Sequence, residues 1–184
     1  MSTHRILLAI SCAMPLLISG TADAQSPNLG SPGLGKKVTE ADIKQWDISI
    51  LPDGTGLPAG SGTFAQGAKV YAEKCQSCHA EGGKGGGMPG AGPLIGGEPL
   101  AGIDTPKTIK NYYAYATTVF DYIRRAMPMN APRSLPDSEV YALTAYILGL
   151  NKLIGETDVM DAKTLPQVKM PNRDNFTMPY PDRI

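Results

Sequence analysis

Two cysteines and one histidine lie together in the sequence Cys75-Gln76-Ser77-Cys78-His79. Two thiols three positions apart can add to the two vinyl groups of a porphyrin, and the adjacent histidine is then placed under the iron. This C-x-x-C-H pattern is the signature of covalent haem attachment. We therefore predict one haem c attached at Cys75 and Cys78, with His79 as an axial ligand of its iron.

Three other uses of these residues fit the sequence less well. A thioredoxin-like redox pair needs a strand before it and a helix after it, but here a helical pattern precedes the motif and a glycine-rich stretch follows. A zinc site needs four ligands, and residues 25–184 contain no further cysteine or histidine. A disulfide between Cys75 and Cys78 would leave His79 without a role.

The second axial ligand cannot be another histidine of this chain, because His79 is the only histidine after residue 24. It is therefore methionine, a less usual group, or no protein group. Methionine paired with histidine is the common electron-transfer arrangement, and its soft thioether sulfur favours Fe(II) and raises the reduction potential. Residues 25–184 contain six methionines: Met88, Met127, Met129, Met160, Met170 and Met178.

Met127 is the preferred candidate for this ligand, and Met129 is the second. Both lie at the end of a helical pattern, and Pro128 disfavours helix at the residue before it. The chain should leave the helix there and could present a thioether to the iron. Met88 lies only nine positions after His79, which leaves little chain to pass around the porphyrin edge. The alternative for Met127 is simple packing in the core.

The first 24 residues have the order of a secretory signal peptide. The charged start Met1–Arg5 is followed by the apolar run Ile6–Ile18 and then by Ala22–Ala24, an A-x-A cleavage pattern. The apolar run is shorter than the roughly 20 residues that span a bilayer, which argues against a membrane anchor. We expect the mature protein to begin at Gln25 in the periplasm.

The charge of the chain is balanced. It contains 17 Lys and Arg and 17 Asp and Glu, and removal of Arg5 and Asp23 with the signal peptide leaves 16 of each. Binding to nucleic acid needs clustered positive charge to neutralise phosphates, so a nucleic-acid partner is not expected. About 160 residues remain, which is the length of one domain.

The elements that must position the motif are predicted to be helices. Thr63–Gln66 is a capping box that opens a helix through Lys74, and glycine-rich Ala80–Gly102 is a loop. We expect an all-α fold with a signal peptide at 1–24, an N-terminal extension at 25–62, a monohaem domain at 63–150 and an extended C-terminal tail at 151–184. No strand pattern is evident. Further helices are expected within Val38–Ile50 (with Thr39 as a possible N-cap), at Pro106–Tyr115, at Thr117–Ala126, and from Ser134–Asp137 to about Gly149.

This order of elements resembles that of class I cytochromes c. The resemblance implies the class I fold, here with extended N- and C-terminal segments. It also implies that Gly67 and Tyr71 of the first helix cross the last helix near Leu143 and Tyr146, where glycine permits a close approach.

The segment Gly92-Pro93-Leu94 is similar to the proline segment that follows the haem motif in this family. By resemblance, the carbonyl of Pro93 accepts a hydrogen bond from His79, which would fix the tautomer and basicity of the ligand.

Four segments carry a closer likeness: DISILPDGTGLP at 47–58, YATTVFDYIRRAMP at 115–128, EVYALTAY at 139–146 and LPQVKMPNR at 165–173. They look like the cytochrome subunit of the periplasmic sulfane dehydrogenases of bacterial sulfur oxidation, and like related subunits of sulfite dehydrogenases. The resemblance implies that Met127 is the distal ligand and that a molybdenum-cofactor partner subunit performs the oxidation. Members of this family often carry a second haem domain, whereas this chain has one C-x-x-C-H motif.

The expected function is therefore electron transfer, not catalysis, from such a dehydrogenase to a downstream cytochrome c. The tail after Asn151 could wrap a partner through Lys163, Lys169 and Arg173, or lie on its own domain. The alternatives are a free diffusible carrier, the cytochrome subunit of another periplasmic dehydrogenase, and an enzyme or gas sensor with an open haem position.

Overall fold

The computed structural model describes residues 33–176 of the chain. A compact unit begins at Thr39 and takes in the rest of the described residues, whereas residues 33–38 belong to a separate unit and form no helix or strand. The predicted signal peptide and Met178 lie outside the described residues. Within residues 33–176, no helix has the length and apolar character that crossing a membrane requires.

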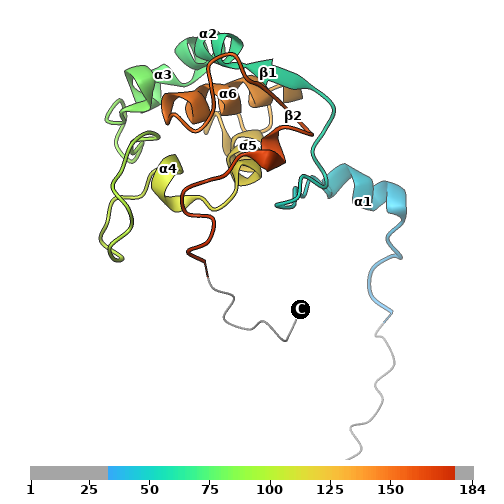
Figure 1. Cartoon of the computed structure of the whole chain (residues 1–184). Helices are drawn as coiled ribbons and strands as arrows, with labels where there is room; N and C mark the ends of the chain where they lie inside the picture. The colour runs from blue at the N-terminus through green and yellow to red at the C-terminus, as the bar shows by residue number, and fades with distance from the viewer. Residues whose placement is uncertain (1–32, 177–184) are drawn as a thin grey trace, which may run out of the picture. The chain divides into compact units, whose positions relative to one another are not determined.

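The unit that begins at Thr39 is mostly helical, as predicted (Figure 1). Two three-residue strands, β1 (Ser61–Thr63) and β2 (Val159–Asp161), were not predicted, and they pair antiparallel with Gly62 opposite Met160. Strands this short contain too little alternation of apolar and polar residues to be found from sequence. The helices are α1 (Glu40–Trp46), α2 (Phe64–Lys74), α3 (Gln76–His79), α4 (Ile109–Tyr112), α5 (Ala116–Ala126) and α6 (Asp137–Leu150), with short 3₁₀ turns η1 (Glu81–Gly83) and η2 (Leu165–Gln167).

Side-chain caps decide where several helices begin. The predicted capping box at the start of α2 is present: the Thr63 hydroxyl accepts from the N–H of Gln66, and the Gln66 side chain accepts from the N–H of Thr63. Thr39 caps α1 in the same way through Asp42. These reciprocal bonds satisfy N–H groups that have no partner within a helix, so both predicted starts are confirmed.

The helix predicted at 106–115 is shorter than expected. Thr108 forms a capping box with Asn111, so α4 begins only after Thr108. Tyr113 is extended (φ −71°, ψ 131°) and ends the helix after one turn. The Asn111 amide also donates to the carbonyls of Glu98 and Pro106, which ties α4 to the preceding loop.

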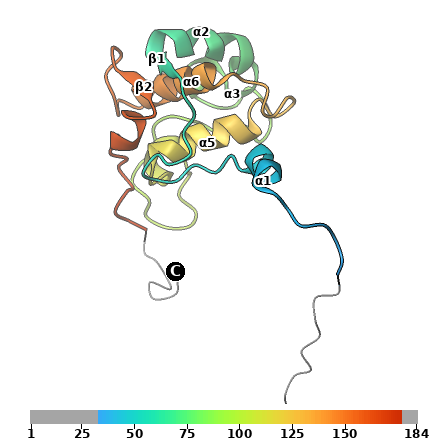
Figure 2. The same ribbon diagram turned by 90° about the vertical axis from the view of Figure 1, so that its right-hand side faces the viewer.

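Helices α2 and α6 cross at Gly67, as predicted (Figures 1 and 2). A Cβ atom on Gly67 would overlap the carbonyl of Ala142 and lie 2.7 Å from Cβ of Tyr146, so the two backbones are in contact. The rings of Phe64 and Tyr71 lie 4.9 and 5.1 Å from the ring of Tyr146 on either side of the crossing. Aromatic pairs at these distances add to the stability gained from burial.

Helix α6 is buried around most of its circumference because it lies between α2 and α5, with β1 and β2 packed beside it (Figure 2). Most side chains of α6 are buried, although Tyr146 is only half-buried. A helix that is apolar all round is expected in such a central position. The buried residues of α6 are Val140, Tyr141, Ala142, Leu143, Thr144, Ala145, Ile147 and Leu148.

The segment from Asn151 to Phe176 packs on its own domain and is not an extended tail. Met160 of β2 is buried, and so are Leu165 and Met170 further along. The Asn172 amide donates to the carbonyl of Tyr112 at 2.7 Å. The compact unit therefore extends beyond the predicted domain boundaries at 63 and 150 in both directions.

Gly67→Ala is expected to lower the free energy of unfolding by about 3 kcal/mol, because overpacking against a backbone is costly. Urea unfolding followed by circular dichroism measures the change. Gly102→Ala is the control, because a Cβ there meets no atom within 4 Å, and it should change the free energy by less than about 0.5 kcal/mol. Equal unfolding midpoints for the two variants would contradict the backbone contact.

Candidate haem site

Cys75 and Cys78 lie where α2 gives way to α3. The N–H of Cys75 donates to the carbonyl of Tyr71, and the carbonyl of Cys75 accepts from the N–H groups of Cys78 (3.1 Å) and His79 (2.9 Å). The two thiols and the imidazole are therefore carried by one helical turn. Both cysteines are half-buried and neither forms a disulfide. Burial raises the pKa of the Cys75 thiol to about 11, so this thiol is protonated at neutral pH.

The imidazole of His79 has a buried nitrogen without a partner. Its Nδ1 atom is enclosed and makes no hydrogen bond with the described residues. Leaving a buried polar group unpaired costs about 1–3 kcal/mol, and native structures contain few such groups, each of which calls for an explanation. This nitrogen therefore needs an acceptor or a bound group that the described residues do not supply in this structure.

The glycine-rich loop after the motif folds back against it. A Cβ on Gly87 would lie 2.7 Å from the carbonyl oxygen of Cys78, and one on Gly85 would lie 2.6 Å from the nitrogen of Pro93. The N–H of Gly85 donates to the carbonyl of His79 at 2.9 Å. These two glycines are therefore required by close contacts, which their predicted place in the loop Ala80–Gly102 does not reveal.

Pro93 lies in this same loop and contacts Gly85, whose N–H donates to the carbonyl of His79. The predicted hydrogen bond from His79 to the carbonyl of Pro93 is not formed in the structure, since Nδ1 makes none. The role of Pro93 stays a prediction. Just beyond it, the buried Asn151 accepts from the N–H of Gly96 and donates to the carbonyl of Leu94, which fixes the loop to the end of α6.

Met127 lies where α5 ends. Its backbone is extended (φ −114°, ψ 144°), so the chain leaves the helix before Pro128, as the sequence analysis predicted. The side chain is half-buried and packs against the hydrophobic core. Met129 is 66% exposed.

Three other candidate methionines among the described residues lie in different surroundings from Met127. Met160 and Met170 are buried in the core, where the segment after α6 packs on the domain. The sulfur of Met88 lies 3.9 Å from the sulfur of Cys78, beside the attachment motif.

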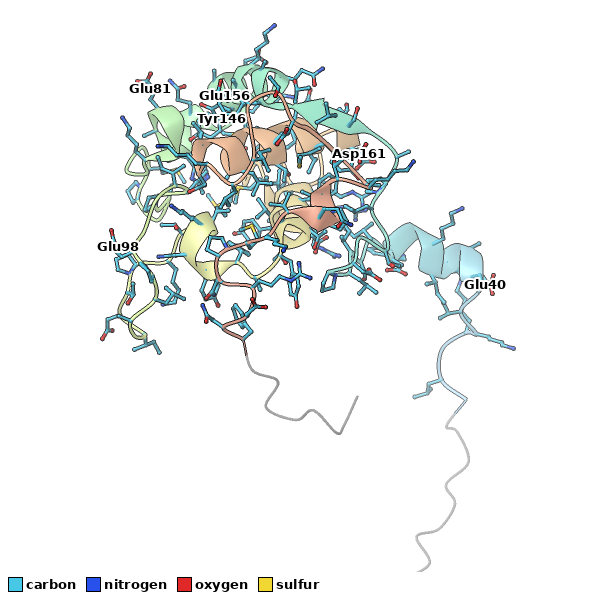
Figure 3. The ribbon with its side chains drawn as sticks, in the orientation of Figure 1. Glu40, Glu81, Glu98, Tyr146, Glu156 and Asp161 are labelled. Atoms are coloured by element: carbon cyan, nitrogen blue, oxygen red, sulfur yellow. The ribbon has the colours of Figure 1, made fainter. Side chains whose placement is uncertain are left out.

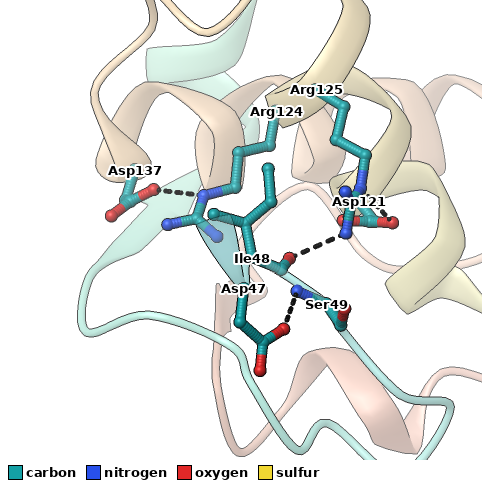
Figure 4. A network of polar contacts seen from close by, with 7 residues as sticks. All are labelled: Asp47, Ile48, Ser49, Asp121, Arg124, Arg125 and Asp137. Atoms are coloured by element: carbon teal, nitrogen blue, oxygen red, sulfur yellow. Dashed lines mark hydrogen bonds and ion pairs between the residues drawn. The ribbon is translucent and has the colours of Figure 1, made fainter. Parts of the chain in front are cut away.

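Ion pairs fix the end of α5 that leads into Met127 (Figure 4). Arg124 bonds to Asp137 at 3.0 Å, which joins the end of α5 to the start of α6 across the loop that carries Met127. Arg125 bonds to both carboxylate oxygens of Asp121 and donates to the carbonyl of Ile48 at 2.9 Å. The N-terminal segment is thereby tied to the same helix end.

Tyr71, predicted to lie at the crossing of the first and last helices, is also a residue of the site. Its hydroxyl donates to the carbonyl of Ala80, the residue after His79, at 2.8 Å. The ring of Tyr146, a residue of α6 labelled in Figure 3, lies 5.1 Å from the ring of Tyr71. No sequence signal identifies such a bond, because the partner is a backbone carbonyl whose direction depends on the fold of the loop.

Two comparisons with known proteins agree with this arrangement. Residues 62–147 match the family model described as cytochrome c oxidase, cbb3-type, subunit III. The chain is also similar to a chain in the crystal structure of the sulfane dehydrogenase SoxCD from Paracoccus pantotrophus, with 36% sequence identity and a TM-score of 0.71. That match covers 83% of this chain and 73% of the other. This chain belongs to the cytochrome c family.

The cytochrome has the predicted class I fold and is an electron-transfer protein that is not itself catalytic. The predicted resemblance to the cytochrome of a sulfane dehydrogenase is confirmed. The residues of the site fit the haem that membership of this family implies, since they provide two unbridged thiols and a buried imidazole nitrogen without a partner. When bound, haem supplies a one-electron Fe(III)/Fe(II) couple.

The hydroxyl of Tyr141 provides a test of burial by pH. It donates to the carbonyl of Pro58 at 2.9 Å, and burial raises its pKa from 10.0 to about 12. The folded protein holds this proton more tightly than the unfolded chain, so the free energy of unfolding falls as pH rises from about 10 to about 12. Tyr141→Phe should reduce the slope of the free energy of unfolding against pH by the equivalent of about one proton. Urea unfolding at a series of alkaline pH values measures the slope, and an unchanged slope would contradict the assignment.

Proposed function

We propose that the cytochrome carries one covalent haem c attached at Cys75 and Cys78, with His79 and Met127 as the axial ligands of its iron. The observation that carries this proposal is the pair of unbridged thiols in the same helical turn as the His79 imidazole. Within the proposal, iron is bound by one ring nitrogen of His79, and the carbonyl of Pro93 accepts a hydrogen bond from Nδ1, the buried nitrogen without a partner among the described residues.

The surroundings of the methionines support Met127 as the second ligand. A thioether ligand has to be shielded from water and held at a fixed point. Met127 is half-buried against the core at an anchored helix end, whereas Met129 is 66% exposed. Met160 and Met170 already pack in the core.

The protein groups around this site would perform three tasks. The turn of α3 and its hydrogen bonds hold the backbone of His79. The Arg124–Asp137 pair holds the ends of the loop that carries Met127. With His79 and Met127 both bound to it, the iron would have no position free for a substrate or a gas, which would suit electron transfer.

We further propose that a molybdenum-cofactor dehydrogenase acting on sulfane or sulfite sulfur is the electron donor and that a downstream cytochrome c is the acceptor. The similarity to a chain of a sulfane dehydrogenase supports this assignment, because it covers 83% of the cytochrome, more than residues 62–147 alone could supply. Cleavage of the signal peptide after Ala24 would place the protein in the periplasm.

Two alternatives have a weaker basis. A free diffusible carrier would need no dedicated partner. The segment after α6 does not require a partner for its buried side chains Met160, Leu165 and Met170, which pack in its own domain, but Val159 and Phe176 are exposed. The cytochrome subunit of another periplasmic dehydrogenase would share every feature of the site. Lys163 and Lys169 remain exposed and could contact a partner in either case.

Met127→Ala should abolish the weak Fe–S(Met) absorption band of the oxidised protein and lower its reduction potential, because the soft ligand that favours Fe(II) is lost. Met129→Ala is the matched control and should keep both properties. Absorption spectroscopy and redox titration measure them. A band that survives Met127→Ala would show that another group is the ligand.

The affinity-tagged full-length cytochrome, purified from its native host, should bring down a molybdenum-containing protein in about equal amount, as measured by metal analysis. Sulfite or thiosulfate should then reduce the haem of the complex, but not that of the isolated cytochrome. Purification of the cytochrome alone would favour the diffusible carrier. A molybdenum-containing complex whose haem is reduced by neither sulfite nor thiosulfate would favour another dehydrogenase.

A further inference from the structure

Ala80, which follows His79, has a backbone conformation that side-chain-bearing residues rarely adopt (φ 59°, ψ 174°). This region is populated almost entirely by glycine, and any other residue there costs about 1–3 kcal/mol. Such a conformation persists only where the surrounding structure holds it. The peptide next to the histidine of the motif is therefore held against the preference of its own residue.

Three hydrogen bonds hold this part of the chain. The Tyr71 hydroxyl donates to the carbonyl of Ala80 at 2.8 Å. The N–H of Gly83 donates to the same oxygen at 3.3 Å, which is long for a bond of this kind. The N–H of Gly85 donates to the carbonyl of His79 at 2.9 Å. The Tyr71 bond is thus the shorter of the two that Ala80 accepts.

The core fixes the position of the Tyr71 hydroxyl. The side chain is 1% exposed, and its ring packs 5.1 Å from that of Tyr146 on α6. Burial also raises its pKa to about 12, so the hydroxyl stays a donor at neutral and moderately alkaline pH. A buried donor that cannot turn toward water exerts a constant restraint on its acceptor.

The restraint on Ala80 acts on the His79 imidazole through the backbone that joins the two residues. Histidine ligands of metals usually gain part of their orientation from a bond through the second nitrogen, and the proposed bond to the carbonyl of Pro93 would supply that part. The rest of the orientation comes from the backbone on each side of the ring. On one side this is the turn of α3, and on the other it is the strained peptide of Ala80.

We propose that Tyr71 is a positioning residue for the haem: its hydroxyl holds Ala80 in the strained conformation and thereby fixes the orientation of the His79 imidazole. The inference rests on the proposed role of His79 as an axial ligand. The α2–α6 crossing sets the position of Tyr71. Under this proposal the crossing therefore also helps to determine the geometry of the His79 ligand.

The test compares three variants of the haem-loaded protein: Tyr71→Phe, Ala80→Gly and the double variant. The electron paramagnetic resonance spectrum of the oxidised protein reports the orientation of the axial ligands through its g values and their spread. Tyr71→Phe should shift or broaden these values, because Ala80 relaxes. Ala80→Gly should leave them unchanged, and in the double variant it should restore them, because glycine adopts this conformation without restraint.

Tyr141→Phe is the matched control. Its hydroxyl also donates from the buried core to a backbone carbonyl, that of Pro58 at 2.9 Å, which is remote in sequence from the haem motif. Both tyrosine variants should raise the unfolding equilibrium constant about tenfold, as expected for the loss of a buried hydrogen bond. Only Tyr71→Phe should change the g values.

Unchanged g values in Tyr71→Phe would overturn the positioning role, and so would a change that Ala80→Gly does not reverse. If Tyr71→Phe fails to load haem, the proposal requires that the double variant load it, and failure of both would overturn it.

A separate variant tests the ligand itself. A low-spin spectrum that survives His79→Ala would contradict His79 as the ligand. If His79→Ala loses that spectrum while Tyr71→Phe keeps unchanged g values, His79 stands as the ligand and only the positioning role of Tyr71 is contradicted.

Discussion

The contact between α2 and α6 at Gly67 sets the position of everything at the site. Because Gly67 has no side chain, the backbone of α2 rests on α6 and the ring of Tyr146 enters between those of Phe64 and Tyr71. The haem motif begins directly at the end of α2, so the line of this helix decides where the two thiols lie. A shift of α2 along α6 would move Cys75, the hydroxyl of Tyr71 and the turn that carries His79 together.

The segments before and after the predicted haem domain stabilise the cytochrome itself. Arg125 donates to the carbonyl of Ile48, and the hydroxyl of Tyr141 donates to the carbonyl of Pro58, so the stretch from Ile48 to Pro58 is fixed to α5 and α6. After α6, β2 pairs with β1, and Arg173 lies 4.8 Å from the ring centre of Tyr115. A domain of this size gains stability from each additional apolar group that it buries. These segments give it that additional burial, which is sufficient reason for their packing without any partner.

Away from the site, polar groups in the interior have hydrogen-bond partners. Within the site, one buried polar atom lacks a partner and one residue has a strained backbone. The hydroxyl of Thr144 donates to the carbonyl of Val140, and the amides of Asn111 and Asn151 bond to loop carbonyls. By contrast, Nδ1 of His79 is the buried side-chain polar atom without a partner in residues 33–176, and the next residue, Ala80, is strained. Costs of this kind concentrate where a site needs a fixed geometry or a ligand.

The sequence by itself determined the local features of this cytochrome. A capping box, a helix ending before Pro128 and a C-x-x-C-H motif each depend on residues a few positions apart. The start of α2 and the end of α5 at Met127 could therefore be predicted, and Cys75, Cys78 and His79 could be proposed as haem-binding residues. Only the tertiary structure decided which backbone groups meet across long separations. The β1–β2 pair, the bond from Tyr71 to Ala80 and the burial of Met160 and Met170 depend on the path of loops whose conformation no local pattern fixes. For the same reason, Gly85 and Gly87 could be recognised as loop residues, but not as points of contact with the haem motif and Pro93.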